Sequence, residues 1–507
     1  MSDDGCSRGA CRGDRQASRS RTRQRVCRRN DPLEASGERL VFRSKRRLCR
    51  RHLFWGEVRK GVGAPSGSTE RGFAVLAIKL RSTLIFVCLL GLLVLPRGAT
   101  AARSCGGDVV CKCGDTVTAS YALPGDLGPC PGHGLTIKSG VRLDCRGFKI
   151  TGSSNAIQQY GVFLDGKPGA EVTGATVKAC HISGFMRGIR LRAASESVIA
   201  DNVTSTNGDF KAHVGYGIDL SGESRNNILQ GNTVRGNADE GIHVGRGSHR
   251  NRLSENVATD NFRESLYVLA SNGGVFLKNT LGGTGVNSLY LKDSSSNHFE
   301  GNTFIGKTVR IIGDSHDNEF IGNTFSGTGL HFLYYKEAPE RRPTNNRVTG
   351  GSIRGASDCL RFTSSSGNVV ADTVLTECRT RVRSEAPEGP AENTLIGIDA
   401  STVSLGEGSV INLAWRLTMH VEDARGVPLA GAQVLAKDAT GTPAFTAVTD
   451  ESGNIPPQVV IASSRTDDKV AAKTPYTIET SKPGYRSDMR TVPIVEHVKL
   501  TVSLESQ

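Results

Sequence analysis

Four residues that could together move a proton occur at wide, regular intervals in this sequence. Asp219, His243 and Tyr267 are each separated by 24 residues, and Arg310 follows 43 residues later. A carboxylate beside an imidazole fixes its tautomer and raises its basicity, a phenol can pass on a proton, and a guanidinium can hold a carboxylate. We therefore predict that these four residues are catalytic and remove the proton beside the carboxylate group of a sugar acid.

Each of these residues is the middle member of an apolar-x-apolar tripeptide. Alternate side chains of a β-strand point to opposite faces, so the apolar flanks should face a core and the middle residues should face water. If the strands stack, the middle residues form one column, called here the central column. Its members are Phe163, Arg190, Asp219, His243, Tyr267, Tyr290, Arg310, His331 and Arg361.

The spacing of the tripeptides predicts the element that positions them. From Arg190 onward the middle residues follow one another at steps of 20 to 30 residues, which is the length of one coil of a parallel β-helix. A second motif, Asn-x-apolar-x-x-Asn, precedes several strands, as in Asn227 to Asn232. Asn tolerates the geometry of tight turns, so we expect stacked Asn ladders at the corners. The period of two and the many glycines argue against helical repeats.

The segment Gly140-Val-Arg-Leu-Asp-Cys-Arg-Gly-Phe-Lys-Ile-Thr-Gly152 is similar to the opening turn of a known family. Together with the repeats from Gly134 to Ala400, it resembles the right-handed parallel β-helix proteins of the pectin-lyase-like superfamily, especially the NosD type. The resemblance implies an all-β fold with a right-handed parallel β-helix over residues 134–410. It leaves the activity open, because the superfamily contains lyases, hydrolases, epimerases and inert scaffolds.

The chain changes character near Leu413. Trp415 to Val421 is a strand-like run, and the segment from Glu422 to Val434 is rich in turn residues. With Thr449 to Ile455, these segments resemble the Cna-B or carboxypeptidase-regulatory type of β-sandwich. The resemblance implies a small β-sandwich over residues 411–507 that serves as a spacer or binding module.

The basic charge is confined to the N-terminal part. Residues 1–81 contain 21 Lys and Arg against 8 Asp and Glu, whereas the remainder contains 42 of each kind. The folded part is therefore neutral, and we expect no nucleic-acid partner. Residues 1–78 are predicted to be a disordered basic leader. One hypothesis is that they are not translated and that translation starts at a non-Met codon near Val75, Leu76 or Ile78, since no Met occurs between Met1 and Met186.

Residues 79–101 have the pattern of a secretory signal peptide. Lys79-Leu-Arg81 precedes an apolar run from Leu84 to Leu95, and Ala99-Thr-Ala101 provides small residues for cleavage. The run is short for a membrane span, so we expect no stable span after cleavage, with an uncleaved anchor as the alternative. The protein is therefore predicted to be secreted, periplasmic or on the cell surface.

Eight of the 13 cysteines follow the signal peptide, and an even number in an exported chain predicts disulfides. Five of them lie in residues 102–145, which we expect to form a cross-linked N-terminal cap. Cys359 and Cys378 are about one coil apart and could bridge neighbouring coils. Cys111-Lys-Cys113 could be half of a metal site, but no matching pair follows at ligand spacing, so neither a metal nor a cofactor is expected.

The central column also predicts a partner. Strands stack about 4.8 Å apart, which is comparable to the rise of one sugar in an extended polysaccharide. We predict that an acidic polysaccharide binds along the column through four further residues: Arg190, Tyr290, His331 and Arg361.

If the protein is an enzyme, the column predicts a uronate lyase or C5-epimerase rather than a hydrolase. Asp219 is its only carboxylate, because Asp239, Glu240 and Asp293 lie off it, and hydrolysis needs two carboxylates. The tripeptide around His133 resembles a short pectinase motif but precedes the first coil, so it is not assigned to the site. The alternative is a non-catalytic exported scaffold, or a carbohydrate-binding or adhesive solenoid, and the residues leave open whether there is catalysis.

Overall fold

A computed structural model describes residues 102–153 and 158–507 of the chain. The leader predicted for residues 1–78 and the signal peptide predicted for residues 79–101 lie outside these residues. Every regular element that the structure describes is a β-strand. Over the same residues, no helix is long and apolar enough to cross a membrane.

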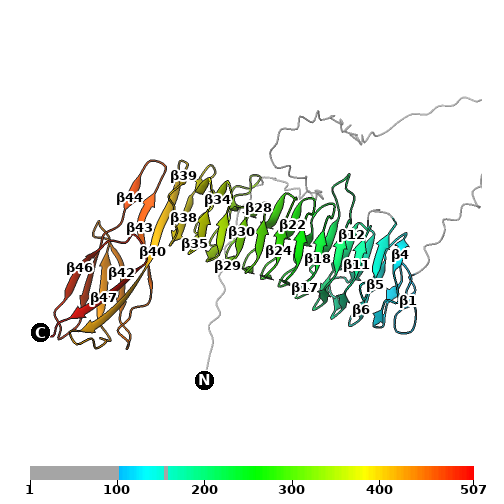
Figure 1. The fold of residues 1–507 in the computed structure, drawn as a ribbon, viewed down its shortest axis with the longest axis horizontal. Coiled ribbons are helices and arrows are strands. Elements are labelled where there is room, and N and C mark those ends of the chain that lie inside the picture. The colour runs from blue at the N-terminus through cyan, green and yellow to red at the C-terminus, as the bar shows by residue number, and fades with distance from the viewer. Residues whose placement is uncertain (1–101, 154–157) are drawn as a thin grey trace, which may run out of the picture. The chain divides into compact units, whose positions relative to one another are not determined.

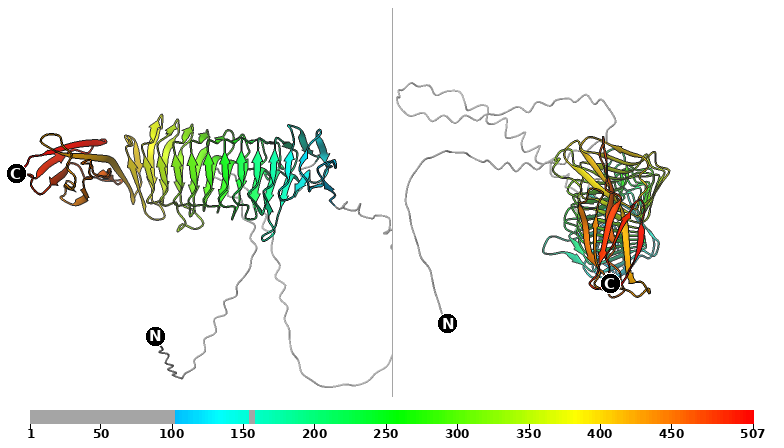
Figure 2. Two further views of the ribbon diagram at one scale, coloured as in Figure 1. Left: turned by 90° about the horizontal axis from the view of Figure 1, so that it is seen from below. Right: turned by 90° about the vertical axis from the view of Figure 1, so that its left-hand side faces the viewer.

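The strands stack into three long sheets, and most coils contribute one strand to each sheet, as successive arrows in Figures 1 and 2 show. All neighbours in the first sheet are parallel, for example β12 and β16. The first sheet contains, in order, β1 (Ser104–Cys105), β2 (Thr116–Val117), β5 (Leu135–Ile137), β8 (Tyr160–Asp165), β12 (Arg187–Arg192), β16 (Tyr216–Ser221), β19 (Ile242–Val244), β22 (Glu264–Leu269), β25 (Asn287–Lys292), β28 (Thr308–Ile312), β31 (Leu330–Leu333), β34 (Asp358–Thr363), β37 (Thr380–Glu385) and β39 (Val403–Leu405).

The second sheet follows the first in each coil. It contains β3 (Tyr121–Ala122), β6 (Arg142–Asp144), β10 (Thr176–Lys178), β14 (Val198–Ala200), β17 (Ile228–Gln230), β20 (Arg252–Ser254), β23 (Val275–Leu277), β26 (His298–Glu300), β29 (Glu319–Ile321), β32 (Arg347–Thr349), β35 (Val369–Ala371), β38 (Ala391–Ile396), β40 (Ser409–Asp423), β43 (Gln458–Arg465), β44 (Val470–Ala472) and β47 (Val498–Leu504).

The third sheet closes each coil. Its strands are β4 (Leu127–Cys130), β7 (Lys149–Gly152), β11 (His181–Ser183), β15 (Val203–Ser205), β18 (Thr233–Arg235), β21 (Val257–Thr259), β24 (Thr280–Gly282), β27 (Thr303–Ile305), β30 (Thr324–Ser326), β33 (Ser352–Arg354) and β36 (Val374–Thr376). The short strands β9 (Val172–Thr173) and β13 (Ala194–Ser195) pair with each other at a corner. The predicted parallel β-helix is therefore confirmed.

The apolar flanks of the tripeptides fill the interior of the coils. Ile189 and Leu191 are fully buried, as the alternation of the strand requires. Further along, Phe276, Phe299 and Phe320 stack on successive coils with ring centroids 4.4 and 4.6 Å apart. Identical residues at one position of each coil thus pack face to face, and the repeat builds one continuous core.

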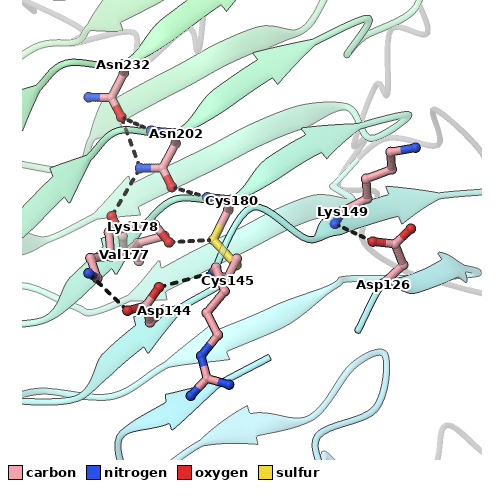
Figure 3. Close-up of a disulfide and its surroundings, with 10 residues drawn as sticks. Asp126, Asp144, Cys145, Lys149, Val177, Lys178, Cys180, Asn202 and Asn232 are labelled. Atoms are coloured by element: carbon pink, nitrogen blue, oxygen red, sulfur yellow. Dashed lines mark hydrogen bonds and ion pairs between the residues drawn. A yellow bond between two sulfur atoms is a disulfide. The ribbon is translucent and has the colours of Figure 1, made fainter. Parts of the chain in front are cut away.

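Asparagine ladders run along the corners, as the sequence predicts. Asn202 Nδ2 donates to Asn232 Oδ1 at 3.0 Å, and the same atom donates to the Val177 carbonyl at 3.1 Å (Figure 3). The bond repeats from coil to coil through the series Asn202, Asn232, Asn256, Asn279, Asn302 and Asn323. These amides are almost fully buried, so each ladder satisfies polar groups that would otherwise cost free energy.

All eight cysteines of the described residues form disulfides, as expected. Two pairs lie within the predicted cap, and a third, Cys145–Cys180, links adjacent turns with Cα atoms 4.7 Å apart (Figure 3). Cys359 and Cys378 pair with Cα atoms 5.7 Å apart. Cys111 and Cys113 are held in separate disulfides, so neither offers a thiolate to a metal.

The C-terminal strands form a small β-sandwich that shares β40 with the β-helix. The first part of β40 pairs with β38, and the remainder pairs with β43 and β47. The other sheet has the order β42-β41-β45-β46, from β41 (Gln433–Lys437), β42 (Pro443–Val448), β45 (Tyr476–Ser481) and β46 (Asp488–Val492). Leu417, Val434 and Ile478 belong to a core separate from that of the coils. The boundary predicted at residue 410 falls inside β40.

Candidate active site

The middle residues of the tripeptides lie in register on the first sheet. Backbone pairing joins Arg190 to Asp219, Asp219 to His243, and so on along neighbouring strands. The same register continues through Tyr267, Tyr290, Arg310, His331 and Arg361, and it extends one strand further to Arg383. The structure therefore brings all eight predicted site residues to one face of one sheet, in the predicted order.

Asp219 and His243 form the most closely connected part of the column. Asp219 is 1% exposed, and its Oδ1 lies 3.0 Å from His243 Nδ1. Its other oxygen lies 3.0 Å from Arg187 Nε and 3.3 Å from Arg190 Nε. Burial opposes ionisation of Asp219, but the hydrogen bond from His243 and the nearby positive charges outweigh it and lower the pKa of the carboxyl group.

An ionised Asp219 sets the protonation of the imidazole. A carboxylate only accepts hydrogen bonds, so Nδ1 of His243 carries the proton and the neutral ring has its lone pair on Nε2. Within the described residues, Nε2 makes no hydrogen bond. This arrangement gives a candidate general base whose tautomer and orientation are fixed by a buried carboxylate.

Two tyrosine rings flank the imidazole. The ring centroids of Tyr216 and Tyr267 lie 4.8 and 5.5 Å from that of His243. Burial raises the pKa of both phenols, and the nearby negative charge of Glu240 raises both further. Both groups are therefore protonated at neutral pH and could donate a proton next to the base. Tyr290 continues the aromatic series, with its ring 5.2 Å from that of Tyr267.

Sequence reasoning missed a second column, three residues before the central one. This upstream column contacts the central column, since Arg187 pairs with Asp219 and the Tyr216 ring lies against His243. Its register is given by the pairing of Arg187 with Tyr160 and Tyr216, and of Glu264 with Asn287. The upstream column comprises Tyr160, Arg187, Tyr216, Glu240, Glu264, Asn287 and Asp358, together with Thr308, which pairs with Asn287 but lies only two residues before Arg310 because the register shifts there.

A glycine explains how both columns share one face. In Tyr216-Gly-Ile-Asp219 and Glu240-Gly-Ile-His243, two successive residues point inward, which breaks the strict alternation of the strand. The inward site has no room for a side chain: a Cβ on Gly217 would lie 2.3 Å from Val234, and one on Gly241 would lie 2.4 Å from Asn261. The recurrent pattern polar-Gly-Ile-polar was the signal available in the sequence.

Three carboxyl groups gather beside this centre. Asp239, Glu240 and Glu264 are all buried, and each offers an oxygen within 4.8 Å of those of the other two. Arg263 is their nearest cation, 3.5 Å from Asp239 and 3.6 Å from Glu264. Burial raises the pKa of Asp239 to about 6 and raises that of Glu240 well above its usual range. Asp219 is the only carboxylate of the central column, as expected, but these three carboxyl groups lie beside it, so the argument against hydrolysis that rested on a single carboxylate no longer holds.

A hollow of about 330 Å³ lies further along the same face. The polar side chains around this distal hollow are Thr308, Thr328, His331, Asp358 and Arg361. Burial and the charges of Arg361 and Arg310 lower the pKa of His331 to about 4, so the ring is neutral at pH 7. Two atoms of the hollow, Asp358 Oδ1 and Arg361 Nε, are buried without a hydrogen-bond partner among the described residues.

The register separates Arg310 from the Asp219–His243 centre. Arg310 lies on β28, three strands beyond His243, a distance of about 14 Å at the usual strand spacing. His331 lies one strand further, at about 19 Å. The cations that do reach the centre are Arg187 and Arg190. His331 instead lines the distal hollow, and Arg310 lies on the neighbouring strand.

Residues outside the predicted column also border this face. His133, which sequence reasoning left out of the site, stacks on Tyr160 with ring centroids 5.0 Å apart. At the other side, the insertion near Tyr335 contacts the end of β25, where Lys292 Nζ lies 3.9 Å from the centre of the Tyr335 ring. Arg341 of the same insertion pairs with Asp293. One long insertion thus borders the columns, in the long repeat step between His331 and Arg361.

Known structures similar to this chain share little sequence identity with it. The A-module of the mannuronan C-5 epimerase AlgE4 of Azotobacter vinelandii is 15% identical, with a TM-score of 0.33, over 53% of this chain and 88% of that one. The A-module of AlgE6 from the same organism is 12% identical, with a TM-score of 0.31, over 61% and 87%. DFA-IIIase from Arthrobacter chlorophenolicus A6 is 14% identical, with a TM-score of 0.31, over 56% and 74%.

No curated protein matches the sequence. A family model matches residues 114–329, which run from the predicted cap to the strand before His331. That family is described as the periplasmic copper-binding protein NosD.

Proposed function

We propose that the first sheet binds an acidic polysaccharide and that the Asp219–His243 centre removes the C5 proton of a uronate residue. The observation that supports this most strongly is the 3.0 Å contact between His243 Nδ1 and Asp219 Oδ1. It leaves Nε2 as a base beside two protonated phenols and two guanidinium groups. A base, an acid and a cation for the carboxylate are the groups that C5 chemistry requires.

In the proposed reaction, His243 Nε2 takes the C5 proton and the electron pair of the C–H bond moves toward the uronate carboxylate. Arg187 and Arg190 stabilise the charge that develops there, in place of the more distant Arg310. If Tyr216 or Tyr267 then gives its proton to C5 from the opposite side, the sugar is epimerised. If the C4–O bond breaks instead, a C4–C5 double bond forms and the phenol protonates the departing oxygen, which is a lyase reaction.

The remaining residues of the column are assigned to substrate binding. Tyr290 offers a ring for stacking next to the centre. Arg310 has no ion-pair partner in the part of the chain that the structure describes, so it can take a sugar carboxylate. At the distal hollow, Arg361 can donate to a sugar ring, while Asp358 and the unprotonated ring nitrogen of His331 can accept from its hydroxyl groups. The polysaccharide would then lie along the central column with about one sugar per strand.

We also infer that the protein acts outside the cytoplasm, in the periplasm or at the cell surface. The four disulfides support this inference, because disulfides persist in oxidising compartments. The separate core of the C-terminal sandwich supports its assignment as a spacer or binding module of the Cna-B or carboxypeptidase-regulatory type.

Incubation of the purified protein with alginate and with pectate tests the proposal. Absorbance of the unsaturated product would mark a lyase, and a change of C5 configuration seen by NMR would mark an epimerase. Retained binding of the polymer with neither signal would favour the alternative, a non-catalytic carbohydrate-binding solenoid. If the protein neither binds nor changes either polymer, the proposal that this face acts on a polyuronate is wrong.

A further inference from the structure

The three carboxyl groups beside the centre would carry an uncompensated negative charge if all of them were ionised. Asp239, Glu240 and Glu264 are between 3 and 4% exposed, so water does not compensate their charge. Arg263 is the only cation paired with them in the described residues. If all three are ionised, the group with Arg263 carries a net charge of −2. Burial of an uncompensated charge costs several kcal/mol, so these carboxyl groups must either retain protons or bind a compensating cation.

Buried oxygen atoms without partners show where that compensation is missing. Glu240 Oε2 is buried and accepts no hydrogen bond from any described residue, and the Glu240 carboxyl group points into the group formed with Asp239 and Glu264. Asn287, which contacts Glu264, provides a second buried oxygen atom without a hydrogen-bond partner. This amide is 2% exposed and donates to Glu264 Oε1 at 2.9 Å, while its own Oδ1 has no partner within residues 102–153 and 158–507.

We propose that Asp239, Glu240 and Glu264 bind one hard divalent cation, with Ca²⁺ as the best fit. A divalent cation would balance the charge of −2, and carboxylate and amide oxygens are the ligands that Ca²⁺ prefers. One oxygen of each carboxylate lies within 4.8 Å of those of the other two, close enough for all three to reach a single ion. Ca²⁺ accepts flexible sets of carboxylate and amide oxygens, whereas Mg²⁺ demands near-ideal octahedral geometry and retains several waters, so Ca²⁺ is the better fit to three fixed side chains.

Copper, which the description of the matching family names, does not fit these residues. The three ligands are hard carboxylates, whereas copper sites are built from imidazole and sulfur ligands. All eight described cysteines are in disulfides, and the three-residue group contains no histidine. No step of the proposed reaction is therefore assigned to copper. The cation proposed here also revises the expectation from the sequence that the chain holds no metal.

The proposed cation would lie next to the catalytic centre but does not depend on the proposed reaction. Glu240 and Glu264 belong to the upstream column. They lie three residues before His243 and Tyr267, in the same coils. Whenever these carboxyl groups are ionised without a cation, their negative charge would repel an anionic sugar bound at that level. A bound Ca²⁺ would remove this repulsion and could take a sugar oxygen as an additional ligand.

Calorimetric titration of the chelator-treated protein with CaCl₂ tests the cation site, with MgCl₂ and CuSO₄ titrated in parallel. We expect one Ca²⁺ per chain at this site, weaker Mg²⁺ binding and no copper binding that depends on Glu240. Glu240→Gln, which keeps the shape and removes one charge, should weaken Ca²⁺ binding at least tenfold. Glu255→Gln, at an exposed position on a neighbouring turn, should leave it unchanged. Unaltered Ca²⁺ binding in Glu240→Gln, or no Ca²⁺ binding by the natural protein, would overturn the proposal.

Terbium luminescence gives a second measurement that needs no variant. Tb³⁺ takes the place of Ca²⁺ and emits when a nearby tyrosine is excited. Tyr216 and Tyr267 both lie close enough to Glu240 to interact with its charge. We expect tyrosine-sensitised emission that Ca²⁺ displaces. Emission that is absent, or that Ca²⁺ does not displace, would contradict the site even if Glu240→Gln fails to fold.

Discussion

His243 and Asp219 are register partners on adjacent strands, and their side chains meet at 3.0 Å between Nδ1 and Oδ1. The contact depends on the fold, because only the stacking of two coils brings residues 24 positions apart to neighbouring strands. It gives the imidazole one fixed tautomer and directs its basic nitrogen away from the carboxylate.

The first prediction concerns the partner of the base. Asp219→Asn should lower kcat on a polyuronate by about 100-fold or more with a smaller change in KM, because the amide no longer fixes the tautomer of His243. Steady-state kinetics would measure this split. Asp165→Asn is the matched control, since Asp165 pairs with Arg192 on the same sheet and should leave kcat unchanged. An unaltered kcat in Asp219→Asn would exclude the proposed role.

The second prediction concerns chain length. The distal hollow lies four strands from His243, so only chains of about five sugars or more can occupy both. Arg361→Ala should raise KM for long oligouronates and leave KM for trisaccharides unchanged, because the latter do not reach the hollow. Arg354→Ala, on an exposed strand of the third sheet, is the control. Equal effects of Arg361→Ala on short and long chains would place Arg361 outside the substrate path.

The third prediction is the pH dependence of stability that His331 contributes. The pKa of His331 is about 4 in the folded protein, below its ordinary value of 6.5. Between these values the unfolded chain binds a proton that the folded chain does not, so the free energy of unfolding falls as the pH drops from 6.5 to 4. The difference amounts to at most about 3 kcal/mol. Denaturant unfolding should show this loss in the natural protein and a smaller one in His331→Gln, and identical pH profiles would contradict the assignment.

The fourth prediction concerns the Asn ladder. Asn256 Nδ2 donates to the Leu229 carbonyl at 2.9 Å and to Asn279 Oδ1 at 3.0 Å, and its Oδ1 accepts two bonds from Asn232. Asn256→Ala leaves these buried groups unpaired, so we expect a loss of about 3 kcal/mol in the free energy of unfolding. Gln230→Ala, at an exposed position on β17, should change stability by less than about 0.5 kcal/mol. If Asn256→Ala also lowered the free energy of unfolding by less than about 0.5 kcal/mol, water would be replacing the hydrogen bonds of the ladder.

The central column and the β-helix could be predicted because the same alternation of inward and outward side chains produces both. Ile189 and Leu191 are buried, Arg190 between them faces outward, and the same alternation recurs in every coil. The upstream column could not be predicted from that rule, because Gly217 and Ile218 both point inward and bring Tyr216 to the same side as Asp219. Alternation alone would place Tyr216 on the opposite face.

Distance along the column was the other property that the sequence did not reveal. The types of Asp219, His243 and Arg310 suit one reaction, but a column places them at successive heights rather than around one point. Arg187 and Glu240 reach the centre because they lie three positions before a central residue on a neighbouring strand. Predicting a site on a β-helix therefore requires both columns and the number of strands between their members.

The most direct test of the proposed function follows the C5 proton of the uronate by NMR in D₂O. The natural protein should remove the C5 proton signal, either by exchange with deuterium during epimerisation or by formation of the unsaturated product. His243→Gln should slow this loss by at least about 100-fold, whereas His181→Gln, on an exposed position of the third sheet, should leave the rate unchanged. Loss of the C5 signal at the same rate in His243→Gln and the natural protein would contradict the role of His243 as the base.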